Sequence, residues 1–289
     1  MRKFIMELLV VSRMNGKIGV FPRRTDAGMK LISLAFRGAG LSVLLALLPG
    51  GFSTMVHAQT DEIQVYDGEI AGPGQFNVAL HNNYTPSGRT QPDFPGGIIP
   101  DHALNGTLEW AYGVKEWMEL GAYFPLYSRT GDGSFLYNGA KVRTTFVVPH
   151  ARERRFFYGA NFEFSYNSGH WEPTVYSGEI RLIIGGRWGP MDVIINPIWG
   201  TQFEQIGDLD FGPAERIAYN FSPTWTGAIE HYSDYGPIRQ FMPAGQQSHT
   251  LIAVLDYNGE PDSVEFGVGH GLTPASDATI IKLIIAHNF

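Results

Sequence analysis

The side chains best suited to chemistry in this 289-residue chain are its histidines, serines and carboxylates. The absence of cysteine excludes thiol catalysis, thiolate metal sites and disulfide bonds. Ser248 and His249 are adjacent, and neighbours in an extended strand point to opposite faces, so they make no nucleophile and base pair. The sequence therefore predicts no enzyme, no metal site and no cofactor. The histidines beyond residue 58 are scattered singly, without metal-ligand spacing: His81, His102, His150, His170, His231, His249, His270 and His287.

Charged side chains recur instead on one face of segments that alternate between apolar and polar residues. Alternation with period two marks a strand whose faces meet different environments. A charge beside a low-dielectric wall is costly unless it is paired or hydrated, so we expect ion pairs across neighbouring strands. Glu119 is expected to pair with Lys141 or Arg143. The charges that share the inward parity number six acidic and six basic: Glu109, Glu119, Glu163, Glu179, Glu230 and Glu265, with Lys141, Arg143, Arg181, Arg187, Arg216 and Lys282.

Twelve such segments supply the strands that position these charges. Short and longer connections alternate between them, and segments of about ten alternating residues with this asymmetry are typical of membrane β-barrels. The predicted fold is all-β, a closed antiparallel transmembrane barrel of about 12 strands. A secreted sandwich or jelly roll is the alternative, since it would use the same turns. The segments are 75–84, 102–112, 117–127, 139–148, 156–167, 174–187, 191–203, 213–221, 224–234, 248–257, 263–271 and 278–289.

Large aromatic residues fall into two bands, which matches the girdles that flank the apolar belt of a membrane barrel. The band beside the short connections holds Tyr112, Trp117, Phe156, Trp188, Phe221, Trp225, Tyr257 and Phe289. The band at the other strand ends holds Tyr127, Tyr166, Trp171, Trp199, Phe203, Tyr232 and Tyr235.

The last segment ends on Phe289 and is expected to pair with residues 75–84, because closure removes both edges of the sheet. In it Lys282 faces inward and is expected to meet Glu265, while His287 is expected at the membrane interface beside Phe289.

The inward charges admit two interpretations. They could fill the lumen and fix strand register as ion-pair ladders, or they could form a constriction that selects solutes. We favour filling, because twelve strands enclose a lumen between that of filled eight-stranded barrels and open sixteen-stranded ones.

The N-terminus reads as a removable leader. Lys30 and Arg37 precede the short apolar run 41–48, and Val56-His-Ala58 offers a cleavage site, so residues 1–58 are expected to be an extension and signal peptide, with Met1 or Met29 as the start. Without it the chain has 13 basic and 26 acidic residues, a formal charge of about −13, which argues against nucleic acid as a partner. Residues 59–74 are expected as a periplasmic N-terminal segment and 75–289 as the barrel.

Several short motifs resemble a bacterial outer-membrane family labelled "MetA-pathway of phenol degradation". They include Glu62-Ile-Gln-Val-Tyr-Asp67, Leu80-His-Asn-Asn-Tyr-Thr85, Pro213-Ala-Glu-Arg216 and Gly271-Leu-Thr-Pro-Ala-Ser-Asp277. The resemblance spans nearly all of residues 60–289.

The resemblance implies a transporter-like barrel in the outer membrane for a small, aromatic or hydrophobic solute. Its expected partners are outer-membrane lipids, that solute and the barrel-assembly machinery, which would recognise the strand ending at Phe289. The alternatives are a structural or binding barrel with a closed lumen and a lipid-modifying enzyme.

Overall fold

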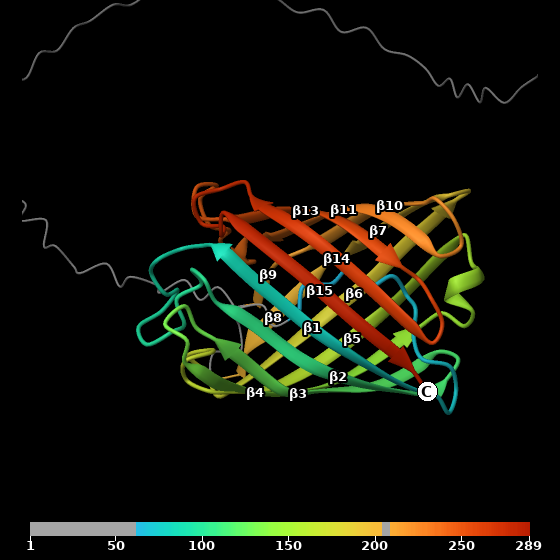
Figure 1. Ribbon diagram of the computed structural model, residues 1–289, viewed down its shortest axis with the longest axis horizontal. Helices are drawn as coiled ribbons and strands as arrows, with labels where there is room; N and C mark the ends of the chain where they lie inside the picture. The colour runs from blue at the N-terminus through green and yellow to red at the C-terminus, as the bar shows by residue number, and fades with distance from the viewer. Residues whose placement is uncertain (1–61, 204–208) are drawn as a thin grey trace, which may run out of the picture. The chain divides into compact units, whose positions relative to one another are not determined.

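The alternating segments form one closed antiparallel sheet in the computed structural model, which describes residues 62–203 and 209–289 (Figure 1). A 3-10 helix, η1 (Ala151–Glu153), lies between β4 and β5. No helix among these residues is both long and apolar enough for a membrane crossing. The strands are β1 (Phe76–Ser87), β2 (Leu104–Lys115), β3 (Met118–Arg129), β4 (Phe135–Val147), β5 (Phe156–Asn167), β6 (Tyr176–Trp188), β7 (Met191–Asn196), β8 (Ile198–Gln202), β9 (Leu209–Phe211), β10 (Ala214–Asn220), β11 (Trp225–Asp234), β12 (Gly236–Pro237), β13 (Ser248–Tyr257), β14 (Asp262–Gly271) and β15 (Thr279–Asn288).

The fifteen strands make twelve passages along the barrel wall, because three of the passages are each interrupted and so divided into two strands. Pro197 alone separates β7 from β8, Gly212 and Pro213 separate β9 from β10, and Tyr235 separates β11 from β12. A proline occurs at the first two interruptions, and because it has no N–H to donate to the ladder, pairing stops there and resumes beyond it. The strand β6, for example, pairs with both β7 and β8. The predicted twelve-stranded barrel is confirmed.

The eighth passage begins earlier than the sequence predicted. The sequence analysis starts this strand at residue 213, because Gly212-Pro213 reads as the end of a loop. The structure instead pairs β9 with β8 and β12, so Asp210 and Phe211 belong to the wall. Gly212 and Pro213 therefore mark an irregularity within one membrane-crossing strand. The walls of β-barrels tolerate such irregularities.

The barrel closes where the sequence predicted, with β15 against β1 (Figure 1). Ala79 faces Ala286, Asn83 faces Lys282, and the N–H of Phe289 donates to the carbonyl of Phe76 at 2.8 Å. Closure matters because lipid offers no hydrogen bonds to an unpaired strand edge. The pairing of β1 with β15 therefore satisfies the backbone hydrogen-bonding groups of both strands.

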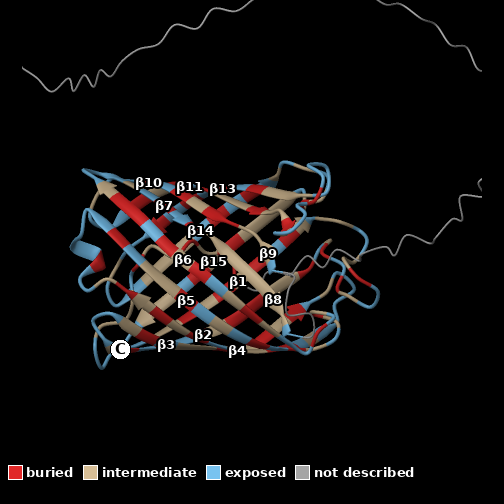
Figure 2. Cartoon of the chain, turned by 180° about the vertical axis from the view of Figure 1, so that it is seen from behind, coloured by how far each residue is buried: buried red, intermediate tan, exposed pale blue. Residues whose placement is uncertain are grey.

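The outer face of the wall is apolar and exposed, and the inner face is polar and buried (Figure 2). On β5 the exposed Tyr158, Phe162 and Phe164 alternate with Asn161 and Ser165, which are 0% and 3% exposed. A soluble sandwich would place its apolar side chains inward. This inverted distribution on a closed sheet is that of an outer-membrane barrel.

Aromatic side chains border the outer apolar face at both ends of the strands. On the short-turn side, for instance, Trp225 packs on Tyr257 with ring centroids 5.2 Å apart. Two assignments to the opposite band are wrong: Tyr232 faces the lumen, where its hydroxyl donates to Glu230 at 2.7 Å, and Trp171 is buried among loop residues. This residue is 1% exposed and packs with Ile98 and Ala103, because loop residues there form a small core of their own.

Candidate functional site in the barrel lumen

The lumen contains the N-terminal segment, residues 62–74, which the sequence analysis expected in the periplasm. The side-chain amide of Asn196 bonds both backbone polar groups of Tyr66. The Tyr66 N–H donates to Asn196 Oδ1 at 2.6 Å, and Asn196 Nδ2 donates to the Tyr66 carbonyl at 3.0 Å. The Tyr66 hydroxyl lies 2.7 Å from that of Tyr123. The Arg181 guanidinium lies 4.3 Å from the centre of the Tyr66 ring. These contacts satisfy backbone groups that would otherwise be buried without partners.

Apolar side chains of the segment also pack on the inner wall. Val65 joins a buried cluster that includes Phe157 and Ile183, and Ile63 joins a second cluster that includes Ile252. An inner wall that was only polar would give such side chains no partner. The segment is therefore fitted to this lumen by shape as well as by hydrogen bonds.

The predicted inward charges lie on the inner wall, and several form buried ion pairs. Arg143 contacts Glu109 and lies 2.7 Å from Glu119, as the pairing of β3 with β4 predicted. His81 Nε2 lies 2.9 Å from Glu109, and Thr145 accepts a hydrogen bond from Arg143. Removing one partner from such a buried group is costly, because the other charge stays buried without compensation.

A second group of ion pairs surrounds Arg216 and Lys282. Arg216 contacts Glu230 and Asp256, and Lys282 contacts Glu230 and Glu265. The predicted contact between Lys282 and Glu265 is therefore present. Asp256 was missing from the predicted set although its even position on β13 gave it the inward parity. We call these two groups, centred on Arg143 and on Arg216 with Lys282, the ion-pair belt.

The remaining predicted charges lie apart from the belt. Lys141 on β4 pairs with Glu163 on the neighbouring β5 at 3.2 Å. Arg181 pairs with Glu179 at 2.9 Å. Arg187 lies near the short turns, where it donates to the carbonyl of Ala151 at 2.7 Å.

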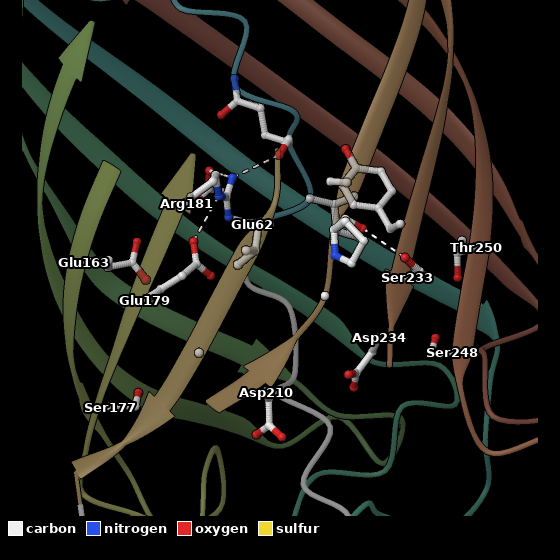
Figure 3. A pocket seen from close by; sticks show the side chains of 18 of the residues that line it. Glu62, Glu163, Ser177, Glu179, Arg181, Asp210, Ser233, Asp234, Ser248 and Thr250 are labelled. Atoms are coloured by element: carbon white, nitrogen blue, oxygen red, sulfur yellow. Dashed lines mark hydrogen bonds and ion pairs between the residues drawn. The ribbon is translucent and has the colours of Figure 1, made fainter. Parts of the chain in front are cut away.

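Two chambers lie on either side of the N-terminal segment. The upper chamber, toward the long loops, has a volume of about 320 Å³ (Figure 3). The lower chamber, toward the short turns, has a volume of about 680 Å³. Glu62, Ile63 and Gln64 line the upper chamber, and residues from Gln64 to Gly72 line the lower one. The same stretch of chain is thus the partition between them.

The upper chamber is rich in carboxylates and hydroxyl groups, and an extracellular loop closes one side of it. Burial alone would lower the pKa of the Arg89 guanidinium in that loop, but the carboxylates of Asp93 and Asp277 outweigh burial and raise the pKa. Arg89 therefore stays cationic and ties the loop to Asp277. The charged side chains that line the chamber are Glu62, Arg89, Lys141, Glu163, Glu172, Glu179, Arg181, Asp210, Asp234 and Asp277.

Two histidines that the sequence analysis treated as isolated meet on the outer face. His231 Nδ1 lies 2.9 Å from Glu215, and His231 Nε2 lies 3.1 Å from His249 Nδ1. Ser248 has the opposite parity and lines the upper chamber, so it does not approach the His249 ring. Within residues 62–203 and 209–289, no group of three or more potential metal ligands occurs.

Comparison with solved structures supports the barrel architecture. The chain resembles the COG4313 outer membrane channel from Pseudomonas putida F1, with 13% identity and a TM-score of 0.53 over 79% of this chain and 100% of that one. It also resembles the NanC porin, with 8% identity and a TM-score of 0.47 over 74% of this chain and 98% of that one. Only the first of these likenesses supports the fold.

The chain is an outer-membrane β-barrel protein. No family model matches it, and no curated protein matches it. The resemblance to the family labelled for phenol degradation therefore stays a prediction.

Proposed function

We propose that this barrel is a channel for the passive uptake of a small, aromatic or otherwise hydrophobic solute across the outer membrane. The observation that supports it is the pair of chambers inside one barrel, with the N-terminal segment between them. Only non-covalent contacts hold the segment, such as those between Tyr66 and Asn196. Its displacement would join the chambers into one path.

An apolar surface at the base of the upper chamber supports a hydrophobic solute. Ile63 of the segment packs there with Ile252 and Ile280 of the wall. A solute that reaches this base would find aliphatic surface beside polar walls. Such a mixture is typical of small-molecule sites, where apolar area gives affinity and a few polar groups give orientation.

We assign a structural role to the ion-pair belt within this proposal. Its members contact one another or the N-terminal segment, as Lys282 does through the carbonyl of Ile63 at 3.3 Å, and all of them except the half-buried Glu265 are buried. A group that already has close charged partners has little capacity left to select a passing solute.

Conductance in planar bilayers tests the channel. We expect discrete conductance steps from the folded protein and none from the boiled protein. A bilayer that stays sealed at every voltage would contradict the proposal and would favour the closed-lumen binding barrel. Release of fatty acid from phospholipid vesicles would instead favour the lipid-modifying enzyme.

Two proposals concern the ends of the chain. We propose that residues 1–58 are removed, so that mass spectrometry of protein from membranes should give Gln59 as the first residue. We also propose that the assembly machinery recognises β15 through Phe289. Deletion of Phe289 should lower the amount of folded barrel in the membrane, whereas deletion of the exposed Phe135 side chain by Phe135→Ala should not.

A further inference from the structure

The upper chamber combines a surplus of negative charge with an apolar base, and this combination defines a solute class. Seven carboxylates and three cationic side chains line it, a surplus of four negative charges. Three or more charges of one sign around a narrow path attract counter-ions and repel ions of the same sign. An anionic solute is therefore disfavoured in this chamber.

The cationic side chains of the chamber already have carboxylate partners. Arg181 pairs with Glu179, Lys141 pairs with Glu163, and Arg89 pairs with Asp277. By count of charges, the four other lining carboxylates make up the difference of four. Three of these, Glu172, Asp210 and Asp234, come from a loop or from strand ends at the mouth and are half-buried.

Glu62 is the fourth, and it lies deeper, next to the apolar base. Its side chain is 3% exposed, and its Oε1 accepts no hydrogen bond from the described residues. The nearest cation, Arg181 Nη1, is 3.7 Å away, which is beyond hydrogen-bond distance. A buried carboxylate oxygen without a donor is costly, and an N–H group from a solute would supply that donor.

The base beside Glu62 is aliphatic and aromatic. Ile63, Ile198, Ile252 and Ile280 line it together with Tyr232. Ile63, Ile252, Ile280 and Tyr232 belong to one packed cluster. A solute with an apolar body can place that body here while its polar end stays within reach of the carboxylate.

We propose that the upper chamber binds small organic cations, namely amines that carry an aromatic or aliphatic body. The ammonium group donates to Glu62, and the body lies against Ile63 and its neighbours on the wall. The carboxylates at the mouth raise the local concentration of the cation. This inference rests on the proposed channel function and narrows its solute class.

Binding of three matched probes tests the inference: 2-phenylethylammonium, the neutral isostere 2-phenylethanol and the anion phenylacetate. Calorimetry with the full barrel in lipid nanodiscs, against empty nanodiscs, should show the amine binding about tenfold more tightly than the alcohol, and no binding of the anion. The preference should shrink as salt is raised. Equal affinity for amine and alcohol in the native protein would overturn the proposal.

Variants identify the residues that cause the preference for the amine over the alcohol. Glu62→Gln should bring amine and alcohol close to parity, while the double variant Asp210→Asn with Asp234→Asn should reduce the preference about threefold. Asp132→Asn, an exposed acidic residue in the β3–β4 turn, is the matched control and should keep the full preference. Retention of the full preference by both chamber variants would also overturn the proposal. A heat-dependent mobility shift on gels verifies that each variant is folded.

Conductance and amine binding, measured on the same protein, distinguish this inference from the proposed channel function. Conductance without any preference for the amine would leave the channel standing and refute the cation site. Preferential binding of the amine by a barrel that never conducts would support the cation site and refute the channel.

Discussion

The ion-pair belt and the mouth of the upper chamber use the same residue types inside one barrel and differ in burial. Lys282 and Glu230 of the belt have side chains that are 0% exposed and in direct contact. Asp210 and Asp234 of the chamber are half-buried at its mouth. Partly exposed charges keep some of their hydration, whereas buried charges depend on their partners, so the charges at the mouth of the chamber stay in contact with water.

An inward-facing position on a strand therefore does not by itself determine the role of a charged side chain in the lumen. The sequence analysis grouped twelve inward charges as one set. The structure places seven of them in the belt and four in the wall of the upper chamber, while Arg187 lies near the short turns. The belt should therefore govern stability, and the chamber should govern the choice of solute.

The largest effect is expected in the belt. Glu230→Gln removes the carboxylate that contacts both Arg216 and Lys282, so the free energy of unfolding should fall by about 3 kcal/mol. Denaturant titration in lipid vesicles measures it. Glu116→Gln is the control, because Glu116 and its partner His150 have side chains that are both 58% exposed, and it should cost less than about 1 kcal/mol. Equal losses in the two variants would remove the distinction between belt and surface charges.

An intermediate effect is expected at the partition. Asn196→Ala removes both hydrogen bonds to Tyr66, each worth about 1 kcal/mol, so the N-terminal segment should leave its site more often. The fraction of time spent conducting should rise about thirtyfold in single-channel records. Asn220→Ala, which alters a lumen asparagine bonded to Asp192 and Thr226, is the control. If Asn196→Ala and Asn220→Ala conduct for the same fraction of time, the N-terminal segment is not the barrier to conduction.

The smallest effect is expected above the chamber. Arg89→Ala removes the guanidinium that contacts Asp93 in the same β1–β2 loop and Asp277 in the β14–β15 loop, and its cost in stability should be below about 1 kcal/mol because the loop lies outside the sheet. Limited proteolysis should instead cut residues 88–103 faster than in the native protein. Arg129→Ala, at the exposed end of β3, supplies the comparison. Unchanged proteolysis would mean that other contacts hold the loop.

The fold could be predicted because strand alternation is a local signal. Parity along each segment identified the inward side chains, and the order of the segments identified their neighbours, which sufficed for the contacts of Arg143 with Glu119 and Lys282 with Glu265. Closure then followed from the need to remove sheet edges.

The partition could not be predicted in this way. Residues 62–74 show no strand period, and nothing local indicates that Tyr66 meets Asn196, which lies 130 positions away. The meeting of His231 with His249 escaped for a similar reason, since the long connection between their strands does not fix which residues face each other. Trp171 was misplaced because its partners are in another loop.

Lys282 also sets an order of events in time. It lies in the last strand of the chain, yet it donates to the carbonyl of Ile63, 219 positions earlier, as well as to Glu230. That contact cannot form until β15 has joined the sheet, so the first described residues of the chain must wait for the final strand. The contacts of the partition are therefore complete only once the final strand is in place.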